Sequence, residues 1–190
     1  MKTASLLLTF AVASAAALAA HANVAQTTRH DYELAAGLVV LLDVPDTWLG
    51  GIADKAGQRV PSILFRNASG PRFQVLLSVA PMSDLKAVEA RVQMDADQFA
   101  SIAVGGKTPL HKVGAAHGQG WYFRLTDKQY ADPKSVVPVG EFKYLAQGAV
   151  IEGPMTLLFS ILTNDDSRAV EAAALVMIRK AAIRQDGGST

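Results

Sequence analysis

Two stretches of this sequence are apolar at nearly every position, and they constrain the fold more than any other feature. LVVLLDV occupies residues 38–44, broken only by Asp43, and MTLLFSILT occupies residues 155–163. A strand with one face in water alternates apolar and polar residues, whereas continuous apolar runs of this length are typical of strands covered on both faces. The sequence therefore predicts a sheet with helices packed on both of its sides.

The patterns between these two runs predict a hairpin and a first helix. SILFR at residues 62–66 and FQVLLSVA at residues 73–80 flank the turn residues NASGP, which indicates a hairpin. Apolar residues then recur every three or four positions from Leu85 to Ala103. This spacing predicts a helix that Ser83 or Asp84 caps and that Gly105 and Gly106 end.

The second half repeats the order of strands followed by a helix. GWYFRLTD, EFKYLAQGAVI and MTLLFSILT are rich in β-branched and aromatic residues, and Gly153 and Pro154 suit a turn between the last two. A closing helix is expected after residues 164–167, with its apolar face formed by Val170, Ala173, Ala174, Met177, Ile178 and Ala181. Strands joined by short turns imply antiparallel pairing, so we predict one α+β domain over residues 31–190, with a polar, flexible lead at residues 23–30.

These elements resemble the PsbP/Mog1-like fold, an α/β/α sandwich. The resemblance rests on a strand that ends in Val44-Pro45-Asp46-Thr47-Trp48, an early hairpin, the long hairpin FKYLAQGAVIEGPMTLLFSI and a C-terminal helix. It covers residues 31–183 and implies a non-enzymatic scaffold that binds partners. It assigns no catalytic residue to this chain.

The first 22 residues have the layout of a secretory signal peptide. Lys2 is followed by an apolar, alanine-rich run that ends at Ala20-His21-Ala22, which places small residues at both positions that a signal peptidase reads. A transmembrane anchor is the alternative, but a spanning helix needs about 20 strongly apolar residues and this run is mostly alanine. We expect cleavage after Ala22 and a soluble protein in the bacterial periplasm or outside the cell, without a membrane anchor in the mature form.

The charge balance argues against one class of partner, and the cysteine content limits how the chain can be stabilised. The chain has 18 Lys and Arg against 17 Asp and Glu, and removal of Lys2 leaves the two signs equal. Nucleic-acid binding requires a basic surplus, so no nucleic-acid partner is expected. Because the chain contains no cysteine, its stability must come from its core.

The segment TDKQYADPKSVVPVGE, residues 126–141, is the best candidate for a contact surface. It separates two predicted strands by more residues than a hairpin needs, and loops of this length are either solvated connections or functional sites. Tyr130, Asp132 and Lys134 supply an aromatic ring and both signs of charge. Trp48 is a second, weaker candidate, although a tryptophan after a turn more often closes the end of a core.

Several motifs that suggest chemistry are better explained structurally. GGKT at residues 105–108 lacks the first glycine of a phosphate-binding loop and follows a helix, so we interpret it as a helix stop. His111 and His117 are six residues apart without a third metal ligand, and the spacing of a calcium loop is absent, so no metal or cofactor is expected. A triad of Ser135, His117 and Asp127 stays open, because triads are defined by geometry rather than by order.

These observations favour a non-catalytic binding or interaction protein of the bacterial envelope that contacts a protein or another envelope component. The alternative is an exported hydrolase whose active site carries no recognisable motif. A hydrolase requires a pocket with convergent titratable groups, whereas a binding module does not.

Overall fold

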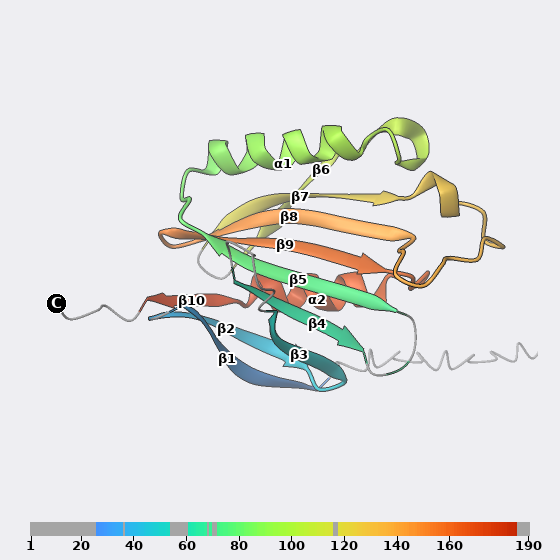
Figure 1. Ribbon diagram of the computed structural model, residues 1–190. Coiled ribbons are helices and arrows are strands. Elements are labelled where there is room, and N and C mark those ends of the chain that lie inside the picture. Colours follow the sequence, from blue (N-terminus) through green and yellow to red (C-terminus); the bar gives the residue numbers. More distant parts are fainter. Residues whose placement is uncertain are drawn as a thin grey trace, which may run out of the picture.

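The protein is an α+β structure in which two helices pack on opposite sides of a central antiparallel sheet (Figure 1). The computed structural model describes residues 26–35, 37–53, 61–67, 69, 72–115 and 118–185. Its elements, in chain order, are β1 (Thr27–Ala35), β2 (Leu38–Pro45), β3 (Trp48–Ala53), β4 (Ser62–Asn67), β5 (Phe73–Ala80), α1 (Leu85–Phe99), η1 (Val104–Gly106), β6 (Leu110–Gly114), β7 (Gln119–Thr126), η2 (Lys128–Tyr130), β8 (Tyr144–Glu152), β9 (Met155–Thr163), α2 (Ala169–Arg179) and β10 (Ala182–Gln185).

The strands form two sheets. Seven of them pair in the order β3-β4-β5-β9-β8-β7-β6, and β1, β2 and β10 form a separate sheet with β2 in the middle. Every pairing is antiparallel. β9 lies at the centre of the larger sheet, where it pairs with β5 on one side and with β8 on the other.

The two faces of the seven-stranded sheet are covered differently. On one face α1 packs Val88, Val92 and Ala96 against residues of β7 and β8. On the other face α2 and the small sheet share the cover, and α2 contacts both β2 and β9 (Figure 1). The molecule therefore has two cores, one under α1 and a larger one under α2 and β2.

The predicted hairpins and both helices are present, but the sequence did not assign every segment correctly. The run at residues 38–44 forms a strand as predicted, yet β2 belongs to the small sheet, whose inner face carries the fully buried Val40 and Leu42. Thr27 to His30 form the first half of β1 rather than a flexible lead, because they pair with the end of β2. The predicted signal peptide lies outside the described residues.

Four strands had no clear pattern in the sequence that would have predicted them. Both helices are present but differ in detail from their predicted form. β1, β3, β6 and β10 are short or polar strands at sheet edges, where one-sided burial leaves a weak pattern. α1 ends at Phe99, and Gly105 and Gly106 follow in η1 with positive φ angles. In α2 the buried residues include Glu171 and Leu175 rather than Ala173.

In the part of the chain that the structure describes, no helix is long and apolar enough to cross a bilayer.

The position of Phe159 provides a test of the sheet assignment. Its side chain is 2% exposed and lies on the face of β9 that packs toward α2, so Phe159→Ala should remove transfer energy and leave a cavity. We expect the free energy of unfolding, measured by chemical denaturation, to fall by about 3–5 kcal/mol. Leu162→Ala, on the half-buried face of the same strand, is the control and should cost clearly less. Equal losses would contradict the assigned faces of β9.

Candidate functional site

The candidate site arises because α1 covers only part of its face of the sheet. The helix contacts β6, β7 and β8 but leaves the neighbouring surface of β9, β5 and β4 without a helix above it (Figure 1). Side chains on this surface are half-buried although they belong to central strands, among them Leu64, Leu76 and Leu158. The result is an apolar floor beside the flank of α1.

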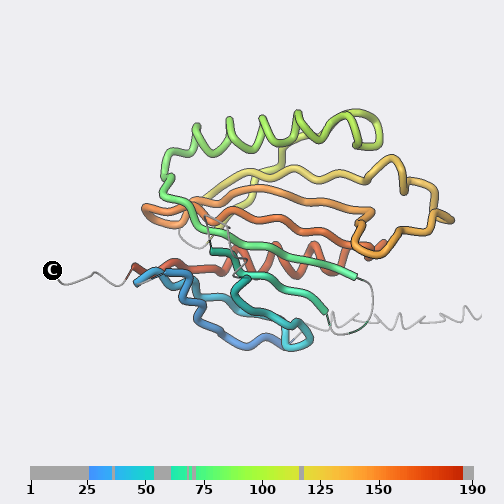
Figure 2. The backbone as a smooth tube through the Cα atoms, viewed as in Figure 1, coloured from blue at the N-terminus to red at the C-terminus, as the bar shows by residue number. Residues whose placement is uncertain are grey.

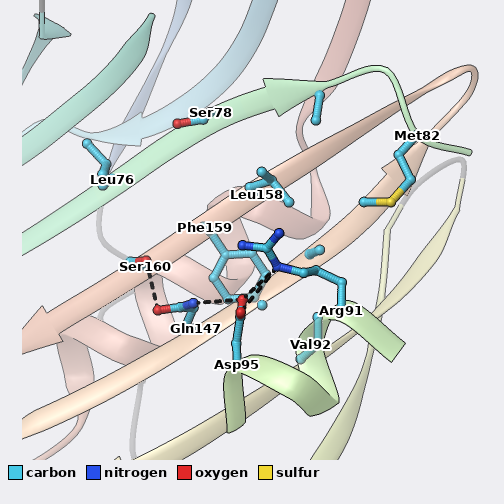
Figure 3. Close-up of a pocket in the computed structure, with 13 residues that line it drawn as sticks. Leu76, Ser78, Met82, Arg91, Val92, Asp95, Gln147, Leu158, Phe159 and Ser160 are labelled. Atoms are coloured by element: carbon cyan, nitrogen blue, oxygen red, sulfur yellow. Dashed lines mark hydrogen bonds and ion pairs between the residues drawn. The ribbon is translucent and has the colours of Figure 1, made fainter. Parts of the chain in front are cut away.

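A cavity of about 290 Å³ lies where this floor meets α1 (Figure 3). Its apolar lining comes from strands and helix together, and includes Leu76, Leu158, Met82 and Val92. Its polar lining consists of Ser78, Ser160, Gln147, Arg91 and Asp95. Because β5, β8, β9 and α1 all contribute, the cavity depends on the assembled fold rather than on any one segment.

A chain of hydrogen bonds runs from the helix to the sheet across this cavity (Figure 3). The Nε atom of Arg91 donates to Asp95 Oδ1 at 3.2 Å, and Gln147 Nε2 donates to Asp95 Oδ2 at 3.1 Å. Ser160 Oγ lies 3.5 Å from Gln147 Oε1, at the limit for a hydrogen bond. Asp95 is thus held by two donors, one of which is the 59% exposed side chain of Arg91.

Arg91 keeps donors for a further partner. Its two Nη atoms make no hydrogen bond to any described residue, and its side chain, which is 59% exposed, reaches from α1 over the sheet (Figure 3). Two serine hydroxyls, those of Ser78 and Ser160, also line the cavity, and the Ser78 hydroxyl pairs with Ser62 at 2.7 Å. The site can therefore donate hydrogen bonds to an acceptor group that lies above an apolar floor.

Among the described residues that line the cavity, neither serine hydroxyl is hydrogen-bonded to a base. Arg91 and Asp95 are the two ionisable residues among the described residues that line the cavity, and they pair with each other. No hydrogen bond between described residues joins a serine hydroxyl to a histidine. Asp127, from the triad left open above, accepts from the backbone N–H of Gln129 instead, and His117 lies outside the described residues.

The loop predicted to carry function is partly a structural element. Tyr130 is only 4% exposed, and its hydroxyl donates to Glu141, so its ring is not a surface for stacking. Asp132 accepts from the backbone N–H of Lys134 at 2.8 Å, which shapes a turn, and both side chains are exposed. None of these three residues lines the cavity beside α1.

The other motifs singled out from the sequence have structural roles. Trp48 is half-buried, with its ring centroid 4.7 Å from that of Phe73, so it closes the end of the larger core. In GGKT the Thr108 hydroxyl donates to the carbonyl of Ala96 at 2.7 Å, which ties the segment to the end of α1. The His111 ring lies against Tyr122, and the described residues include no group of three potential metal ligands.

Sequence reasoning missed the residues of the cavity for a physical reason. Arg91 and Asp95 are spaced like any solvated ion pair on a helix, so only the sheet beneath α1 gives them a further role. One signal was present in the sequence. Gln147 is a large polar residue inside the otherwise apolar run YLAQGAVI, and such a residue needs a partner when it is half-buried.

A second polar cluster, at the opposite end of β8 from the β8–β9 turn, is structural. Arg168 adopts a left-handed conformation with φ 61°, its guanidinium carbon lies 4.0 Å from the Tyr144 ring centroid, and it pairs with Glu171 at 2.6 Å. Glu171 is 4% exposed and also lies 3.6 Å from Arg124. These contacts neutralise a buried carboxylate and orient the start of α2 on the sheet.

Local hydrogen bonds shift the pKa values of the two carboxylates that precede α2. Burial alone would raise the pKa of Asp165, but hydrogen bonds from Ser167 and from backbone N–H groups including that of Val170 lower it overall. Hydrogen bonds from Lys143 and Tyr144 lower the pKa of Asp166, and the bond to Asp166 raises the pKa of Lys143. Both aspartates are therefore held in their charged form at neutral pH.

No known family model matches the chain, and no curated protein or solved structure is detectably similar to it.

The lowered pKa of Asp165 predicts how stability depends on pH. Its carboxylate stabilises the folded state above its unfolded-state pKa of about 3.9, and this contribution is lost as the pH falls through the lower folded-state value. Asp165→Ala removes acceptors for the first turn of α2 and should cost about 1–2 kcal/mol at pH 7. The difference from the unmodified protein, measured by urea unfolding, should shrink as the pH is lowered below about 4.

Asp31→Ala is the control for this experiment, because Asp31 is exposed on β1. It should leave stability unchanged at both pH values. A cost of Asp165→Ala that stays constant down to acid pH would show that the charge of Asp165 does not stabilise α2.

Proposed function

We propose that the protein is a non-catalytic binding protein of the bacterial envelope, and that the cavity between α1 and the sheet holds its ligand. The single observation that carries this proposal is the position of Arg91. Asp95 holds its Nε atom while its Nη donors have no partner among the described residues, beside the apolar lining of Leu76 and Leu158. Such a combination of apolar walls and a few fixed polar groups is the general form of a small-ligand site.

The geometry limits the ligand to a compact molecule with an apolar part and a hydrogen-bond acceptor. A volume of about 290 Å³ corresponds to roughly ten water-sized groups at ~30 Å³ each. Because Asp95 balances the charge of Arg91, the acceptor can be a carbonyl or a carboxylate. A hydrolase would need a base near a nucleophile, and the described lining residues offer none, so no observation favours that alternative.

The cavity makes a prediction for two matched probes, octanoate and octanamide. Both have about ten non-hydrogen atoms, and they differ only in the acceptor group. We expect both to shift the backbone resonances of the cavity residues in NMR titrations. Arg91→Gln should weaken octanoate at least about tenfold, because a charged hydrogen bond is worth about 1.5–3 kcal/mol, and it should weaken octanamide less.

Two variants complete the test of the cavity. Arg179→Gln, at an exposed position at the end of α2, is the control and should change neither affinity. Ser160→Leu should fill the cavity and weaken both probes. If neither probe shifts cavity resonances, or if Arg91→Gln and Arg179→Gln behave alike, the cavity is not the ligand site.

We also propose export through the leader at residues 1–22 and kinship with PsbP/Mog1-like proteins. The small residues Ala20 and Ala22 support cleavage before Asn23. The central antiparallel sheet with a helix on either side, and Trp48 shortly after Pro45, support the kinship.

The proposed export predicts where the mature protein begins. When the full chain is expressed in a bacterium with a periplasm, the intact mass of the periplasmic protein should correspond to a chain that starts at or near Asn23. Ala20→Leu with Ala22→Leu should block processing, because a signal peptidase accepts only small residues there. Full-length protein in the cytoplasm, for the unmodified chain, would contradict the proposal.

A further inference from the structure

We propose that β3 is a docking edge for an extended peptide segment of a partner protein, which joins the seven-stranded sheet as an additional strand. The segment places an apolar side chain over Gly51 and a carboxylate near Arg66. This site shares no lining residue with the cavity beside α1, so the two proposals can be tested independently.

The outer edge of β3 carries backbone N–H and C=O groups with which a further strand can pair along its length. β3 is the last strand of the sheet, and within the described residues it pairs with β4 alone (Figure 2). Natural edge strands are usually protected by charged residues, proline or a bulge. β3 has the sequence WLGGIA and pairs with β4 in continuous register, so it carries none of these protections.

Exposed apolar side chains add to the available edge. Leu49 is 52% exposed and Ile52 is 47% exposed, on opposite faces of β3. An added strand would cover part of both side chains, which stabilises the complex beyond the backbone hydrogen bonds.

The two glycines of β3 differ in a way that points to a ligand. At Gly50 a Cβ atom would lie 2.4 Å from Cε1 of Phe65 and 2.8 Å from the hydroxyl of Tyr32, so the fold itself requires glycine there. At Gly51 a Cβ atom would meet nothing within 4 Å, and the φ angle is not in the left-handed region. Glycine inside a strand weakens it and often marks a place where another backbone or a ligand approaches closely.

The missing side chain of Gly51 leaves a notch on the same face as α1. The notch has a volume of about 240 Å³, and Leu49, Ala53, Leu64 and Arg66 contribute to its lining. Leu64 pairs with Gly51 across the β3–β4 ladder and forms the floor. Because residues opposite one another in a ladder point to the same face, the residue of the added strand opposite Gly51 would place its side chain over Leu64.

Arg66 defines the charge of the partner. It is exposed, forms no ion pair with any described residue, and pairs with Leu49 in the ladder. An acidic residue two positions from the notch residue, opposite Leu49, would lie within reach of its guanidinium. A second copy that pairs through WLGGIA offers no acidic residue opposite Leu49, so the geometry favours a partner segment over self-pairing.

The test uses Gly51→Val and a matched control, Gly114→Val. Gly114 is also in an edge strand, β6 at the opposite end of the sheet, and a Cβ atom there would likewise meet nothing within 4 Å. Since valine favours strands and both positions are open, we expect both variants to keep or raise the melting temperature. Gly51→Val fills the notch and Gly114→Val does not.

The probe is a fluorescently labelled peptide that alternates threonine with leucine, in which one leucine is replaced by glutamate. We expect the peptide to bind the protein purified after export in fluorescence anisotropy titrations. Gly51→Val should lower its affinity at least about tenfold, while Gly114→Val should leave the affinity unchanged. A peptide with lysine in place of glutamate should bind less tightly. Arg66→Gln should remove the difference between the two peptides.

Three outcomes would overturn the proposal. The first is that the glutamate peptide does not bind, and the second is that it binds Gly51→Val as tightly as the unmodified protein. The third is that sedimentation shows a dimer of the unmodified protein that Gly51→Val abolishes, which would make a second copy the occupant of the edge. If Gly51→Val fails to fold, Leu49→Lys tests the same edge, because this exposed side chain can carry a charge without entering the core.

Discussion

The structure depends on the pairing of β9 with a strand on each side over almost its full length. Residues 155–163 pair with β8, and residues 156–163 also pair with β5, so the backbone groups of this strand are satisfied within the sheet. Its side chains divide between the two cores, with Leu157, Phe159 and Ile161 on the side of α2. Because β9 is paired along both edges and buried on its α2 face, the neighbouring layers are placed relative to it.

The two candidate binding regions follow from unequal cover of this sheet. One face is closed by α2 together with the small sheet, whereas α1 reaches only as far as β8. The uncovered part of that face forms the floor of the cavity beside α1, and it continues to the notch at β3. A single helix over half of a seven-stranded sheet thus leaves two places where apolar surface remains accessible.

The buried carboxylates at the start of α2 have partners within the fold, and this separates their structural role from a binding role. Glu171 is buried and pairs with two arginines, and Asp165 accepts three hydrogen bonds at the start of α2. Arg91 differs, because its Nε atom is fixed by Asp95 and its Nη atoms have no partner among the described residues. The Arg91 side chain is 59% exposed, so water satisfies these donors when no ligand is bound, and they are accessible to a ligand beside the apolar lining.

The sequence by itself determined the local structure wherever the apolar pattern was strong. The runs at residues 73–80 and 155–163 formed the predicted strands, and both helices lie where their spacing placed them. Periodicity reports which residues are buried, and burial in central strands is extensive enough to leave a clear pattern. Edge strands such as β3 and β10 bury one face or less, so their pattern was too weak to predict them.

Only the tertiary structure decided which apolar faces meet and which polar side chains converge. An apolar run shows that a strand is buried but not which strands it pairs with, so the sequence could not show that β2 lies in a second sheet. For the same reason it could not show that Tyr130 is buried within a loop. Arg91, Asp95, Gln147 and Ser160 come from α1, β8 and β9, and their alignment across one cavity depends on the helix position and on strand register. Those two quantities are set by long-range packing, which no local pattern in the chain encodes.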